Sequence, residues 1–138
     1  LNINGVFSFK TLRPLIRTEE TINAQAAIRL LKDLEAAQPA GEIHIIADNA
    51  RYYRSALVQA HLATEGCRIQ IHFLPPYSPN LNLIERLWGF FKRKVIYGTY
   101  YETFVKFKNA TLAFFRDIGK YHQELSTLMT DNFRVVKI

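Results

Sequence analysis

The chain has 138 residues, 49% of them hydrophobic and 13% aromatic, which excludes a disordered segment and allows one hydrophobic core. No apolar run approaches the roughly 20 residues of a membrane span, and no signal peptide is expected. The formal charge of +6, with 18 Lys and Arg against 12 Asp and Glu, suits a polyanionic partner such as nucleic acid.

The first forty residues predict a β-hairpin followed by a helix. β-forming residues surround the turn dipeptide Asn4-Gly5, and residues 12–17 are expected to form the second strand. Apolar residues recur at helical spacing over residues 24–37, after Asn23 as a candidate N-cap.

The rest of the chain alternates strands and helices. Short apolar runs predict buried strands over residues 42–48 and 69–74, with a helix over 54–64 between them. Three prolines within residues 75–79 exclude regular structure there. Three helices, over about 80–95, 101–117 and 123–129, precede a last strand over 133–138. The alternation predicts an α/β fold in one domain, residues 1–138, with strands between helices.

Two carboxylates stand out by position. Asp48 ends an apolar strand, and ligands collect beyond the C-terminal ends of strands in α/β sheets. It either binds a metal or caps the following turn by accepting a backbone N–H. Glu85 lies near the start of the helix after the prolines and by itself is an ordinary exposed residue. As a pair, the two could hold Mg²⁺ or Mn²⁺, which prefer oxygen ligands.

The segments carrying these carboxylates resemble a known family. IHIIADNARYYRS (residues 43–55) and IHFLPPYSPNLNLIERLWGFFKRKV (71–95) look like the paired signature of DDE-type, ribonuclease-H-like transposases of the mariner-like insertion-sequence superfamily. The resemblance covers most of the chain. It implies a mixed sheet flanked by helices and a catalytic triad of two Asp and one Glu. Asp48 would be the second Asp and Glu85 the Glu, with 36 residues between them (49–84).

The resemblance also implies an activity. It is metal-dependent DNA cleavage and strand transfer in transposition, at a two-metal Mg²⁺ or Mn²⁺ site held by Asp48 and Glu85. DNA would be the partner. The lone cysteine fits a reducing compartment, and the expected location is the cytoplasm, on the nucleoid in a bacterial cell.

Three positions depart from the family pattern. Tyr53 stands where a histidine is frequent, and Leu83 stands where proline is common, but neither change removes a ligand. The first Asp of the triad belongs to a strand upstream of the hairpin that this chain does not contain. We therefore expect a fold whose first strand is missing or supplied elsewhere, with exposed sheet edges that favour homo-oligomers.

The alternative function is a truncated or degenerate relic that binds DNA or self-associates without cutting. A third hypothesis, a nuclease for RNA–DNA hybrids, has no sequence feature in its favour.

Further residues are candidates for contact with DNA, although each also fits an ordinary turn, loop or solvated surface. They are Asn49, Arg51, Tyr77, Arg86, Lys92, Arg93 and Lys94. Cys67 is the only cysteine, which excludes an internal disulfide framework and a thiolate metal cage. It is interpreted as a small apolar core residue, and Trp88 is also assigned to the core. His44 and His72 are interpreted as structural, and His61 has no predicted partner.

Overall fold

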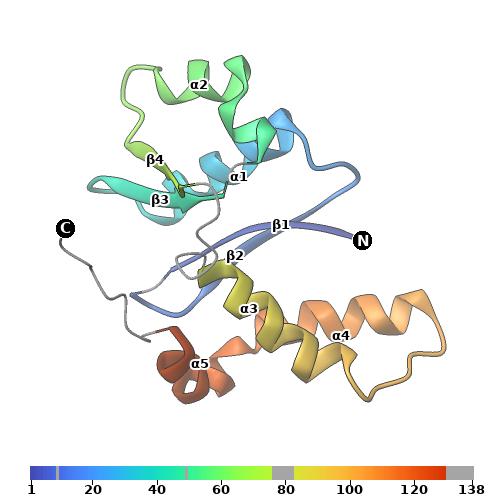
Figure 1. Ribbon diagram of the computed structural model, residues 1–138. Coiled ribbons are helices and arrows are strands. Elements are labelled where there is room, and N and C mark those ends of the chain that lie inside the picture. The colour runs from blue at the N-terminus through green and yellow to red at the C-terminus, as the bar shows by residue number, and fades with distance from the viewer. Residues whose placement is uncertain (9, 49, 76–82, 130–138) are drawn as a thin grey trace. The chain divides into compact units, whose positions relative to one another are not determined.

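The structure is a computed structural model of residues 1–138, and it describes all of them except 9, 49, 76–82 and 130–138 (Figure 1). The described residues form five α-helices and two two-stranded sheets, in the predicted alternating order. They fall into two compact units, residues 1–6 and 15–78 (unit 1) and residues 7–14 and 79–138 (unit 2). Within the described ranges, no helix has the length and apolar character to cross a membrane. The ribonuclease-H-like arrangement and the single domain stay predictions.

The hairpin differs from the prediction in the place of its turn. Asn4 and Gly5 lie inside β1 (Asn2–Phe7), and the chain reverses between that strand and β2 (Pro14–Glu19). Asn4 is buried, and its side-chain amide donates to the carbonyl of Ala26 at 3.3 Å. A Cβ on Gly5 would lie 2.9 Å from the side chain of Ile16. The predicted turn is therefore wrong, because contacts with other elements, and not turn chemistry, explain this dipeptide.

Helix α1 (Ala24–Ala37) confirms its prediction, including the cap. The side-chain oxygen of Asn23 accepts a hydrogen bond from the amide of Ala26 at 2.9 Å, which satisfies one of the free N–H groups of the first turn. The buried face of α1 contributes to the core of unit 1, whose fully buried centre consists of Ala27, Leu31, Ile43, Val58 and Ile69.

Strands β3 (Ile43–Ala47) and β4 (Ile69–Phe73) pair in parallel, with Ile43 opposite Ile69 and Ala47 opposite Phe73. The 3-10 turn η1 (Arg51–Arg54) and helix α2 (Ala56–Leu62) connect them. The predicted alternation of more buried and exposed side chains along β4 is confirmed. The buried strand predicted over residues 42–48 is wrong for one face of β3, since Ile46 keeps 57% of its surface exposed.

Unit 2 is held together by aromatic rings. Helix α3 (Leu83–Phe91) continues into a π-helical turn, η3 (Lys92–Ile96). Helix α4 (Phe104–Arg116), the 3-10 turn η4 (Ile118–Tyr121) and helix α5 (His122–Met129) follow. Trp88 is half-buried and meets the rings of Phe91 and Phe115 edge-on, at centroid distances of 5.8 and 5.9 Å. The strand predicted over residues 133–138 lies outside the described residues.

Candidate active site

Asp48 directly follows β3, at the end of the parallel pair. The amide of Leu74 donates to the carbonyl of Ala47 at 2.9 Å, so β3 and β4 end at the same level. Asp48 is exposed, and its Oδ1 accepts a hydrogen bond from the amide of Ala50 at 3.1 Å. The turn-capping interpretation is therefore confirmed. It engages one carboxylate oxygen, and within the described residues no side chain pairs with the other, Oδ2.

The turn after Asp48 brings two tyrosines near the carboxylate. Burial, followed by the neighbouring Tyr52 and the charge of Asp48, raises the pKa of Tyr53 to about 12. Burial, followed by the charge of Asp48, also raises the pKa of Tyr52. Both phenols therefore stay protonated at neutral pH, where they can donate hydrogen bonds but cannot act as bases. Arg51, a predicted DNA contact, is exposed in the same turn.

Glu85 is exposed in the first turn of α3, where a negative charge suits the positive end of the helix dipole. It belongs to unit 2 and Asp48 to unit 1, so the meeting of the two carboxylates stays a prediction. Their donor chemistry fits a hard divalent cation, because both present exposed carboxylate oxygens.

The predicted DNA contacts divide into two kinds. Lys92, Arg93 and Lys94 are exposed on η3, and Lys94 pairs with Glu124 at 3.2 Å. Arg86 is half-buried, and its guanidinium donates to the carbonyl of Leu128 at 3.1 Å, which joins α3 to α5 within unit 2. The other two candidates, Asn49 and Tyr77, lie outside the described residues.

Two clusters of polar side chains in unit 1 were not predicted from the sequence. His44 Nδ1 and His72 Nε2 lie 2.9 Å apart on the exposed face of the β3–β4 sheet, and His44 Nε2 lies 3.2 Å from a carboxylate oxygen of Glu42. Alternation placed each histidine on its strand's polar face, but the register that joins them was not readable from the sequence.

The second missed cluster consists of Glu35, His61 and Cys67, whose ligand atoms all lie within 4.8 Å of one another. Cys67 is half-buried, and its Sγ lies 3.8 Å from Glu35 Oε1. Cys67 packs against the core of unit 1, as predicted, but its Sγ also meets a carboxylate, which was not predicted. A single cysteine excludes a cage of several thiolates but not a mixed ligand set.

Residues 1–108 match the family model described as DDE superfamily endonuclease. The matched part is more than half of the chain and contains both Asp48 and Glu85. No curated protein and no solved structure matches the chain.

Proposed function

The chain belongs to the DDE superfamily of endonucleases, and from this membership we propose that it performs metal-dependent DNA strand cleavage and strand transfer, the reactions of a transposase. Asp48 and Glu85 are the carboxylates that would hold Mg²⁺ or Mn²⁺. The observation that supports this most directly is the position of Asp48, which is exposed at the C-terminal edge of β3, with its Oδ2 unpaired among the residues that the structure describes.

The chain's own residues would position the reacting groups. The Ala50 amide holds Oδ1 of Asp48 and so limits how the carboxylate can turn. Tyr52 and Tyr53, both protonated, supply neutral hydrogen-bond donors beside it. When bound, divalent cations in such sites activate a water or a 3′-hydroxyl and stabilise the leaving oxygen.

Affinity for DNA would come from exposed cations. The net charge is +6, and Lys92 and Arg93 are exposed on the same π-helical turn. Lys and Arg on phosphates release counterions, which gives affinity without base specificity.

The test is nicking of supercoiled plasmid DNA in Mn²⁺, combined with Mn²⁺ binding by calorimetry. We expect Asp48→Asn and Glu85→Gln each to abolish nicking and to weaken Mn²⁺ binding. Glu65→Gln is the matched control, because Glu65 is an exposed carboxylate in the turn before β4.

Two results would overturn the proposal. One is nicking that both substitutions leave unchanged. The other is absence of Mg²⁺ and Mn²⁺ binding in a chain that still binds DNA, which would favour the non-catalytic alternative.

Self-association through a sheet edge is part of the proposal. Both sheets formed by the described residues have two strands, so each presents edges whose backbone groups can pair with another chain. Light scattering coupled to gel filtration should show a mass above that of the 16.0 kDa chain. A single monomeric mass at high concentration would contradict it.

A further inference from the structure

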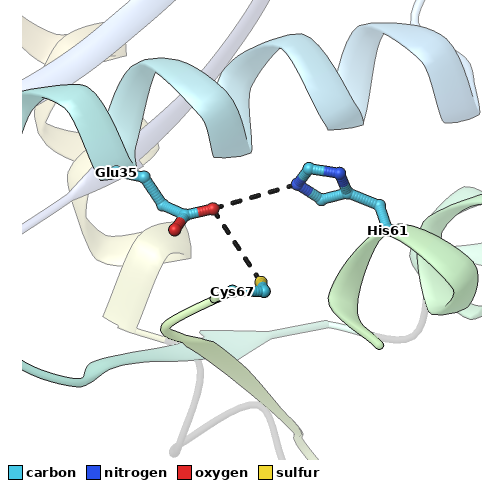
Figure 2. Close-up of side chains that lie close together, drawn as sticks. All are labelled: Glu35, His61 and Cys67. Carbon is cyan, nitrogen blue, oxygen red and sulfur yellow. Dashed lines mark hydrogen bonds and ion pairs between the residues drawn. The ribbon is translucent and has the colours of Figure 1, made fainter. Parts of the chain in front are cut away.

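Three residues with metal-binding side chains point toward one another in unit 1 (Figure 2). Glu35 lies in the last turn of α1, His61 in the last turn of α2, and Cys67 in the segment before β4. The Oε1 atom of Glu35 lies 3.9 Å from His61 Nε2 and 3.8 Å from Cys67 Sγ.

We propose that Glu35, His61 and Cys67 bind one zinc ion. Tetrahedral zinc, with bonds of about 2.0–2.3 Å, holds its ligand atoms roughly 3.3–3.8 Å apart. The two distances from Glu35 Oε1 are already close to this, and the third is within 4.8 Å. Closing the site around an ion requires the ligand atoms to approach one another by up to about 1 Å.

The imidazole of His61 gives independent support. Its Nε2 atom is buried and has no hydrogen-bond partner among the described residues. The carboxylate oxygen at 3.9 Å is too distant for a hydrogen bond. A buried polar atom without a partner is costly, and a cation at the centre of the cluster would satisfy it.

Arg68, whose Nε lies 4.0 Å from Glu35 Oε2, holds the carboxylate in place and already sets one positive charge beside it. The backbone amide of Arg68 donates to the other carboxylate oxygen, Oε2, at 3.4 Å, and its guanidinium donates to the main-chain carbonyl of Glu35 at 2.9 Å. Oε1 is thus left to face His61 and Cys67. Both Glu35 and His61 lie at C-terminal ends of helices, where the helix dipole stabilises a cation.

The types of ligand favour zinc over other metals, and the contacts of Cys67 argue against a role as a catalytic nucleophile. Thiolate with imidazole and carboxylate suits zinc, whereas Mg²⁺ and Mn²⁺ prefer oxygen alone. A cysteine nucleophile would need its thiol hydrogen-bonded to the imidazole, but Cys67 Sγ meets the carboxylate instead. With side-chain exposures of 22% for Glu35 and 17% for His61, water can reach a fourth position on the ion.

Binding breaks the S–H bond of Cys67, forms a Zn–S bond, and releases the proton to solvent without any change of oxidation state. The ion would then join the ends of α1 and α2 to the start of β4. Its role is to stabilise unit 1, because the three segments have no covalent link other than the chain itself.

The experiment uses cobalt as a spectroscopic probe for zinc on the purified, EDTA-treated chain. Cobalt bound to Cys67 should give a thiolate-to-metal charge-transfer band that saturates at one equivalent, and zinc should abolish it by displacement. Cys67 is the only cysteine, so this band reports on the cluster alone. Zinc should also protect the Cys67 thiol from alkylation and raise the melting temperature, and neither measurement requires a variant.

Variants separate a three-ligand site from adventitious binding to the thiol. Cys67→Ser should lose the band, and Glu35→Gln and His61→Gln should each weaken zinc binding at least about tenfold. His72→Gln is the control, because it alters the exposed histidine pair of the β3–β4 sheet and should leave the band unchanged. The proposal is overturned if wild-type chain shows no band and no protection by zinc. It is also overturned if the band persists at full affinity in both Glu35→Gln and His61→Gln.

Discussion

Asp48 Oδ1 accepts a hydrogen bond from the amide of Ala50 at 3.1 Å, so the carboxylate that we propose as a metal ligand also forms the turn after β3. One oxygen shapes the backbone, and no side chain in the described part of the chain pairs with the other. The proposed chemical role would thus be combined with the structural one in a single side chain, and different substitutions should separate them.

Substitutions at Asp48 should separate stability from metal binding. Asn retains an oxygen that can accept from Ala50, so Asp48→Asn should lose Mn²⁺ binding with little change in the free energy of unfolding. Asp48→Ala loses the turn bond as well and should cost about 1 kcal/mol. Urea denaturation and calorimetry measure the two effects. Equal destabilisation by both variants would show that the charge, and not the turn bond, stabilises this loop.

Two glycine-to-alanine changes should have opposite signs. A Cβ on Gly5 would lie 2.9 Å from the Ile16 side chain and 3.0 Å from the Leu15 carbonyl, so Gly5→Ala should destabilise by about 1–3 kcal/mol. In α3, a Cβ on Gly89 meets only the Arg93 guanidinium, at 3.7 Å, and Gly89→Ala should stabilise by up to about 1 kcal/mol. Thermal unfolding of both variants checks this. If Gly5→Ala left the melting temperature unchanged, the close approach of Gly5 to Ile16 and Leu15 would be contradicted.

Acid should remove a stabilising contribution of Glu19. Hydrogen bonds from Arg29, and next from Arg17, lower the pKa of its carboxyl below the usual 4.5, against an opposing effect of burial. The contribution is therefore complete above the unfolded-state pKa and is lost as the pH falls through the lower folded-state pKa. Urea midpoints measured across this range should fall less in Glu19→Gln than in wild type. Glu20→Gln, at the exposed neighbouring position, is the control and should follow wild type.

Cations of unit 2 should differ in what they contribute to DNA binding. Lys92→Gln and Arg93→Gln should weaken binding to all duplexes alike and lower the salt slope by about one each. Arg86→Gln should mainly reduce stability, because its guanidinium bonds the Leu128 carbonyl. Fluorescence anisotropy over a salt series measures this, with Lys32→Gln, an exposed lysine on α1, as control. An unchanged slope in the Lys92 and Arg93 variants would remove them from the interface.

Local patterns were enough to predict several elements. The bounds of α1 and its Asn23 cap follow from helical spacing and from a side chain that bonds its own first turn. The alternation of β4 and the place of Asp48 after β3 likewise depend on neighbours in sequence. The turn expected at Asn4-Gly5 failed because the residues that these two contact, Ala26 and Ile16, lie in other elements.

By itself the sequence determined the α/β order, the family signature around Asp48 and Glu85, and the basic charge, since each is carried by residues close together or by composition. Only the tertiary structure showed that Arg86 bonds the Leu128 carbonyl and that Glu35, His61 and Cys67 converge. These side chains belong to segments far apart in the chain. Their contacts depend on how helices and strands pack, which no local pattern encodes.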